Sequence, residues 1–191
     1  ISGLKIVGKR ISREIIDAYQ SIDLNNIKSA AILKHKKLLI DFPLRRVTIK
    51  EYEEAKAKID EFIANNRGRR VNFEDNARLY VYAGIIERYI LQQSINTFTE
   101  EIHIVRLDDA SFVTNPFELF LNYGNKIRAR SKAKQTFIIQ LACGAGGYLP
   151  TEKAEKGSHY SAYVSSGSTG HEGGDLLVRK TLDAINDMFD K

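Results

Sequence analysis

The 191-residue chain contains one cysteine, Cys143, and lacks any apolar run near the roughly 20 residues that span a bilayer. The single cysteine excludes an internal disulfide framework, and the short apolar runs exclude a transmembrane segment. The first residues, ISGLKIVG, contain neither an initiator methionine nor the apolar block of a signal peptide. We therefore expect a piece of a longer protein, whose compartment the sequence does not reveal.

The sequence also lacks the common signatures of nucleotide binding. The loop GAGGY at 144–148 has no Gly-Lys-Ser/Thr ending and no immediate following helix, so it is not a phosphate-binding P-loop. The spacing of its glycines and the absence of a suitable downstream acid exclude the dinucleotide fingerprint as well.

None of the four histidines pairs with another as His-x-x-x-His, or with a carboxylate, in a zinc-protease pattern. We expect His35 and His103 to lie in strands, and His159 and His171 to lie on the surface beside a long loop. Cys143 has no partner histidine nearby in the sequence, so a buried, unreactive thiol is the favoured interpretation.

Net charge is +5, from 29 basic and 24 acidic residues, with a composition typical of a globular protein. Basic clusters of this kind either form a solvated surface or contact phosphate or a membrane. They contain no aromatic-basic RNA signature, zinc finger or recognition helix, so we expect no nucleic-acid partner. The clusters are Lys34, Lys36 and Lys37; Arg67, Arg69 and Arg70; and residues 126–134.

Hydrophobic periodicity divides the chain into helices and strands. Thr48 and Glu51 form a predicted capping box, and the apolar strand 135–141 is typical of a strand covered on both faces. We expect one domain over residues 1–191 with helices layered on a mixed β-sheet. The predicted helices are 4–22, 51–66, 74–93, 115–131 and 173–189, and the predicted strands are 30–42, 98–107, 110–114 and 135–141.

Two side chains are candidates for chemistry at strand ends. Glu118 is expected in the first turn of a helix that Asn115-Pro116 begins, and Tyr148 follows the strand 135–141 after a glycine-rich turn. Ligands bind at such strand ends in open α/β sheets. The loop 142–172 is long for a compact domain, which favours a functional role. The simpler alternatives are that Glu118 complements the helix dipole and that Tyr148 covers the core.

Two segments together indicate a family. FVTNPFELFLNYGNKIRARS and TFIIQLACGAGGYLPTEKA, followed by YSAYVSS and the helix EGGDLLVRKTLDAI, resemble the neutral/alkaline (non-lysosomal) ceramidase family, with its short bacterial branch the nearer likeness. The resemblance is strongest over residues 98–189. It implies the carboxyl-terminal half of a catalytic domain, with the front half absent.

The resemblance implies a zinc-dependent hydrolase that cleaves the amide of N-acyl sphingosines. That family holds zinc with two histidines, a glutamate and a tyrosine. Its Pro-Gly-Glu segment matches NPFE here, and its tyrosine segment matches YLPT. The resemblance therefore nominates Glu118 and Tyr148 as metal ligands, and Gly146, Gly147 and Thr151 as substrate contacts.

The chain departs from the family pattern in ways that bear on activity. Phenylalanine replaces the motif glycine, and none of the four histidines matches the family's ligand motifs. The histidine ligands and the catalytic groups belong to the missing front half, which the resemblance makes a partner of this chain. We expect the isolated chain to be inactive, with a lipid-like N-acyl substrate for the complete protein. The alternative is a non-catalytic binding module that retains the ceramidase-like fold.

Overall fold

The structure is a computed structural model that describes residues 2–157 and 159–190, and these form two compact units that divide after Ala31. The first unit is helix α1 (Ser2–Gln20) and the 3₁₀ turn η1 (Leu24–Asn26). α1 confirms the predicted helix, and it buries none of its residues. No helix among the described residues is long and apolar enough to cross a membrane.

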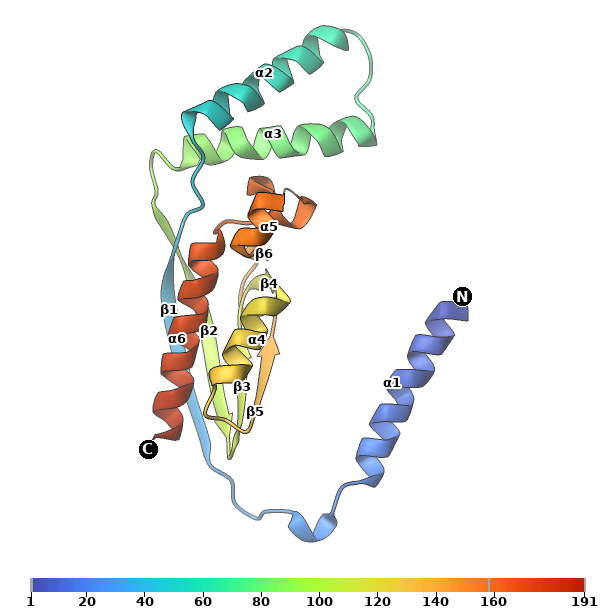
Figure 1. The fold of residues 1–191 in the computed structure, drawn as a ribbon, viewed down its shortest axis with the longest axis vertical. Coiled ribbons are helices and arrows are strands. Elements are labelled where there is room, and N and C mark those ends of the chain that lie inside the picture. The colour runs from blue at the N-terminus through green and yellow to red at the C-terminus, as the bar shows by residue number, and fades with distance from the viewer. Residues whose placement is uncertain (1, 158, 191) are drawn as a thin grey trace. The chain divides into compact units, whose positions relative to one another are not determined.

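The second unit is a mixed α/β layer structure, as predicted (Figure 1). Its main sheet has the strand order β1-β2-β3-β5, in which β3 and β5 are parallel and the other neighbours antiparallel. A second sheet pairs β4 with β6. The elements are β1 (Leu33–Pro43), α2 (Ile49–Asn65), α3 (Phe73–Leu91), β2 (Thr97–Leu107), β3 (Ala110–Thr114), β4 (Phe117–Leu119), α4 (Leu121–Arg130), β5 (Gln135–Ile139), β6 (Gly147–Leu149), α5 (Glu152–Gly157), η2 (Tyr160–Ala162), η3 (Val164–Ser166) and α6 (His171–Phe189).

Helices α4 and α6 cover one face of the main sheet (Figure 1). Alternate residues of β1 and β2 are buried on that face, as a half-covered sheet requires. From α6, the predicted inward residues Leu177, Leu182 and Ile185 are buried against them. Each such side chain contributes about 1.5 to 3 kcal/mol by leaving water, so this layer holds the fold together.

Helices α2 and α3 form an antiparallel hairpin, and each helix begins with a capping box. Thr48 Oγ1 accepts from the Glu51 backbone N–H at 3.2 Å, and the Glu51 carboxylate accepts from the Thr48 N–H at 2.7 Å, which confirms the predicted box. Asn72 and Asp75 form the same reciprocal pair at the start of α3. The stacked rings of Tyr52 and Tyr89, 4.4 Å apart, hold the two helices together.

Two predictions about local structure are wrong. Residues 115–120 do not begin a helix: the buried Asn115 side chain accepts from the Phe117 N–H at 3.1 Å, and the chain then runs extended as β4. Glu118 therefore lies in a strand, and the helix starts at Leu121. The second wrong prediction is that the strand 135–141 is covered on both faces. β5 is an edge strand whose Phe137 and Ile139 are about 40% exposed, because the helices cover only one face of the sheet.

Candidate functional site

Glu118 and Tyr148 lie directly opposite each other in the two parallel strands β4 and β6. The flanking residues Phe117, Leu119 and Leu149 are buried. Because successive side chains of a strand point to opposite faces, Glu118 and Tyr148 emerge together on the other side, half-buried. Backbone pairing therefore makes the two nominated residues neighbours, and their role as metal ligands stays a prediction.

Tyr160 completes this group from a separate segment. Its hydroxyl lies 3.0 Å from the hydroxyl of Tyr148, and the two rings meet edge to face with centroids 5.5 Å apart. The hydroxyl of Ser166 donates to the Tyr160 carbonyl and ties η2 to η3. Sequence reasoning missed Tyr160 because its twelve-residue separation from Tyr148 follows no regular period.

The pKa of the Tyr148 phenol is raised above its ordinary value. The hydrogen bond with Tyr160 is the largest cause, followed by a hydrogen bond to the Glu118 side chain, burial, and the negative charge of Glu118. The phenol therefore keeps its proton and donates toward a carboxylate. A cation placed between these two oxygens would reverse the effect, since positive charge favours the phenolate.

Close packing of the glycine-rich loop holds Tyr148 in place. A Cβ on Gly146 would lie 2.4 Å from the Phe117 ring, and Gly147 has a positive φ of 71°. Gly147 also forms an isolated antiparallel β-bridge with Gly167, so the loop after η3 lies against β6. Only glycine tolerates the left-handed conformation and the near contact at low cost. Gly146 and Gly147 therefore set the direction in which the Tyr148 side chain points.

The predicted substrate contacts at Gly146, Gly147 and Thr151 stay predictions. Gly146 is buried, and its N–H donates to the Pro116 carbonyl at 3.0 Å. Thr151 Oγ1 accepts from the Ala154 N–H at 3.3 Å and so stabilises the start of α5. These contacts give all three residues a structural role.

Arg88 of α3 anchors the segment that carries Tyr160. Its guanidinium donates to the carbonyls of Ser168 at 3.0 Å, Gly167 at 2.9 Å and Arg45 at 3.2 Å. A cavity of about 560 Å³ lies beside this contact, between α3 and η3. Neither Glu118 nor Tyr148 lines that cavity.

His35 and His103 lie in strands β1 and β2, as expected, whereas Cys143 differs from expectation. His103 contacts Glu101 and His171 contacts Glu155, each at 2.8 Å. Cys143 is exposed, with a positive φ of 65°, and is not a buried thiol.

The donor set at Glu118 and Tyr148 fits zinc in part. Carboxylate oxygen is an ordinary zinc ligand, and a phenol oxygen becomes one when a cation lowers its pKa. Zinc normally takes three or four protein ligands. Glu118 and Tyr148 therefore offer two oxygen atoms, which is fewer than the ligands that zinc normally takes.

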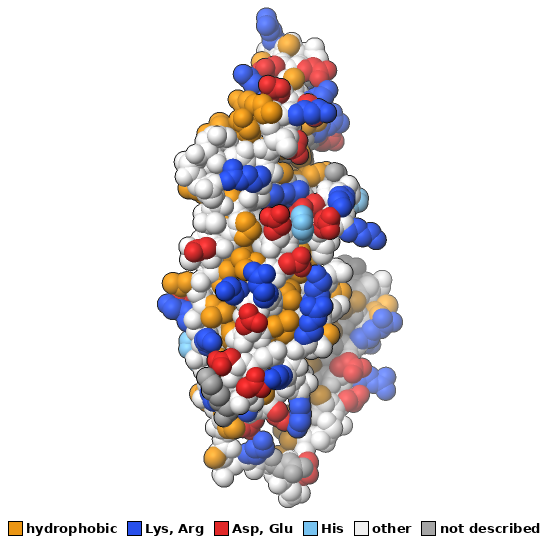
Figure 2. All heavy atoms as spheres, turned by 60° about the vertical axis from the view of Figure 1, so that its left-hand side comes forward, with side chains coloured by type: hydrophobic (Ala, Val, Ile, Leu, Met, Phe, Trp, Pro, Cys, Tyr) orange, Lys and Arg blue, Asp and Glu red, His pale blue; other side chains and the backbone are white. Residues whose placement is uncertain are grey.

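Carboxylates pair with many side chains of the basic clusters. The Lys37 ammonium lies 3.1 Å from Glu101, and Lys126 lies 2.9 Å from Asp175. Figure 2 shows basic and acidic side chains interspersed over one face of the molecule. This mixture resembles a solvated surface more than a phosphate-binding one. The other pairs are Lys36 with Asp187, Arg69 with Asp75, Lys132 with Asp190, and Lys134 with Asp109.

Comparison with known proteins gives similarity to solved structures alone. No protein-family model and no curated protein sequence matches the chain. A structure described as a ceramidase complexed with C2 is 14% identical, with a TM-score of 0.43, and the match covers 48% of this chain and 15% of that one. The neutral ceramidase of Pseudomonas aeruginosa is 13% identical, with a TM-score of 0.46, and the match covers 80% and 28%. The chain thus spans less than a third of either structure.

Proposed function

We propose that this chain supplies Glu118 and Tyr148 to the zinc centre of an amide hydrolase that cleaves an N-acyl linkage in a lipid-like substrate. The observation that carries the proposal is the register of β4 and β6, which sets the carboxylate directly opposite the phenol. The motif resemblance described above supports the substrate class. Further ligands and the catalytic groups come from parts of the protein beyond these residues.

The geometry of the pair supports a cation site. Glu118 and Tyr148 present two oxygens from neighbouring strands. The pKa of Tyr148 is raised, most by the hydrogen bond with Tyr160 and next by the one with Glu118, and a cation bound between the two oxygens would lower it. Bound zinc would polarise the substrate carbonyl or activate a water molecule. Tyr148 must then release its proton, and Tyr160, 3.0 Å away, holds the phenol oxygen in position.

Hydrolysis by the natural full-length protein that contains this chain tests the proposal. We expect cleavage of a fluorogenic N-acyl sphingosine, and a loss of at least about 100-fold in kcat/KM for Glu118→Gln, since even outer partners of a metal cost about 10- to 100-fold. Glu53→Gln, an exposed change on α2, is the matched control and should retain full activity.

Two outcomes would count against the proposal. Full activity in Glu118→Gln would remove the glutamate from the site. Stoichiometric zinc without cleavage of any N-acyl lipid would favour the alternative, a binding module that retains the fold.

A further inference from the structure

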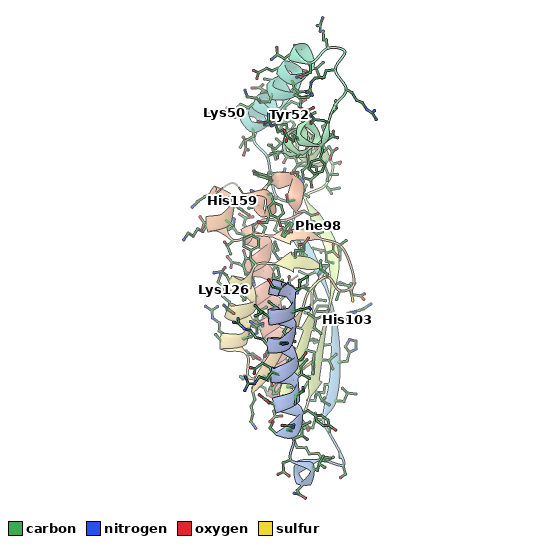
Figure 3. All side chains as sticks on the ribbon, turned by 90° about the vertical axis from the view of Figure 1, so that its right-hand side faces the viewer. Lys50, Tyr52, Phe98, His103, Lys126 and His159 are labelled. Carbon is green, nitrogen blue, oxygen red and sulfur yellow. The ribbon has the colours of Figure 1, made fainter. Side chains whose placement is uncertain are left out.

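The face of the main sheet opposite α4 and α6 carries a second group of donor side chains. Figure 3 shows His103 on the far side of the strands from Lys126 of α4. The ligand atoms of Glu101, His103 and Cys143 lie within 4.8 Å of one another. Two of them are on β2, and the third is on the loop after β5. One carboxylate oxygen, one imidazole nitrogen and one sulfur are therefore close enough together to hold one metal ion.

Neighbouring side chains orient the imidazole. His103 Nε2 lies 2.8 Å from Glu101 Oε1, and His103 Nδ1 lies 2.8 Å from His35 Nε2 on β1. The two imidazole rings also stack, with centroids 5.0 Å apart. A histidine that binds a metal usually donates its other ring N–H to an acceptor such as a carboxylate, a carbonyl or water, which fixes the ring. His35 Nε2 lies where it can be that acceptor.

The carboxylate is similarly prepared. Lys37 Nζ lies 3.1 Å from Glu101 Oε2, which leaves Oε1 as the oxygen that faces His103. Glu101 Oε1 is therefore held on the side of His103, where it can serve as an oxygen ligand.

We propose that Glu101, His103 and Cys143 form a second metal site, of the three-ligand kind that suits Zn²⁺, with His35 as the outer partner of His103. Thiolate and imidazole favour zinc over magnesium or calcium, and three protein ligands leave one coordination position open. Binding releases the proton of the Cys143 thiol to solvent. Neutral His103 then carries its single proton on Nδ1, which donates to the Nε2 of a neutral His35 protonated on Nδ1, and His103 Nε2 is left to bind the metal.

This site is independent of the proposed hydrolase centre. It lies wholly within the present chain, whereas Glu118 and Tyr148 provide only two ligands. We therefore expect any tight zinc binding by the 191-residue chain to occur at Glu101, His103 and Cys143. Failure of either proposal leaves the other in place.

Cobalt titration of the reduced 191-residue chain provides the test. Co²⁺ bound to a thiolate gives a charge-transfer absorption in the near ultraviolet, and Cys143 is the only thiol in the sequence. We expect the band to saturate at one metal per chain and Zn²⁺ to displace it. Cys143→Ser should abolish the band, and His103→Gln should weaken binding by at least about tenfold.

Matched variants separate the site from general effects. His35→Ala should weaken binding by about 10-fold, because it removes only the outer partner of His103. The double variant Glu118→Gln/Tyr148→Phe should bind cobalt with unchanged affinity. Urea unfolding of each variant identifies any that has lost its fold.

Three results would overturn the proposal. The first is that the folded, reduced chain gives no charge-transfer band. The second is that folded His103→Gln binds cobalt with unchanged affinity. The third is a stoichiometry of one metal per two chains. The last result would mean that two thiols from different molecules bind the metal.

Discussion

The two groups of polar side chains are held together by different means. Glu118 and Tyr148 face each other because β4 and β6 pair in register between buried neighbours such as Phe117 and Leu149. Glu101 and His103 meet through side-chain hydrogen bonds on a partly exposed sheet face. The first arrangement depends on the core, whereas the second depends on the side chains themselves. Changes to the core should therefore disturb the first group most.

The largest effect is expected from Phe117→Ala. The Phe117 ring is fully buried, packs edge to face on Phe42 with centroids 5.1 Å apart, and contacts Gly146. We expect a loss of about 3 to 5 kcal/mol in the free energy of unfolding by urea. Phe73→Ala, at a site 86% exposed, should change stability by less than about 0.5 kcal/mol. Equal losses at both positions would contradict the role of Phe117.

Gly146→Ala should cost about 1 to 3 kcal/mol, because the new methyl group would overlap the Phe117 ring. Gly124→Ala on α4 is the control, since its Cβ meets atoms at an ordinary 3.7 Å. Alanine favours helix by about 1 kcal/mol over glycine, so the control should be neutral or more stable in the same urea measurement. A Gly146→Ala protein as stable as wild type would show that β6 has room to move.

Ionisation of Tyr148 sharpens the comparison without disturbing the core. Because its pKa is raised in the folded state, the phenol contributes stability below the unfolded pKa of about 10, and loses it as the pH rises through the folded pKa. Glu118→Gln removes a negative charge and should lower the pKa of Tyr148. His103→Gln, on the other group, should leave it unchanged.

The measurement is a titration of tyrosinate absorbance. The curve of the corresponding Tyr148→Phe protein is subtracted from that of wild type, Glu118→Gln and His103→Gln, which leaves the signal of Tyr148. A Tyr148 that titrates identically with glutamate or glutamine at position 118 would show that the two side chains do not interact.

The smallest effect is expected at Lys37. Its ammonium pairs with Glu101 at 3.1 Å, but both side chains are more than a third exposed. Exposed ion pairs contribute little, so Lys37→Gln should change the free energy of unfolding by less than about 0.5 kcal/mol. A loss above about 1 kcal/mol would mean that the outer sheet face also supports the fold.

Much of the fold could be predicted from local patterns. Alternation identified β1 and β2, and the Thr48 box marked the start of α2. Asn115 shows the limit: Asn-Pro is a common helix start, yet here the asparagine side chain bonds to the Phe117 N–H. Pairing with β6, about thirty residues away, then decides the strand conformation of Glu118, and no local signal reports it.

The candidate sites also contain residues that could be predicted from the sequence and residues that could not. Glu118 and Tyr148 could be nominated because each lies in a motif. Neither Tyr160 nor the proximity of His103 to Cys143 could be predicted, because tertiary folding alone brings these residues near their partners. The exposure of Cys143 was missed for a related reason, since its neighbours in sequence are apolar but its side chain lies near Glu101 and His103 of β2.

The metal content of the natural full-length protein tests the central claim most directly. In a Cys143→Ser background, which removes the second site, we expect one zinc per chain, and its loss in both Glu118→Gln and Tyr148→Phe. Stoichiometric zinc that persists in folded forms of both variants would contradict the account.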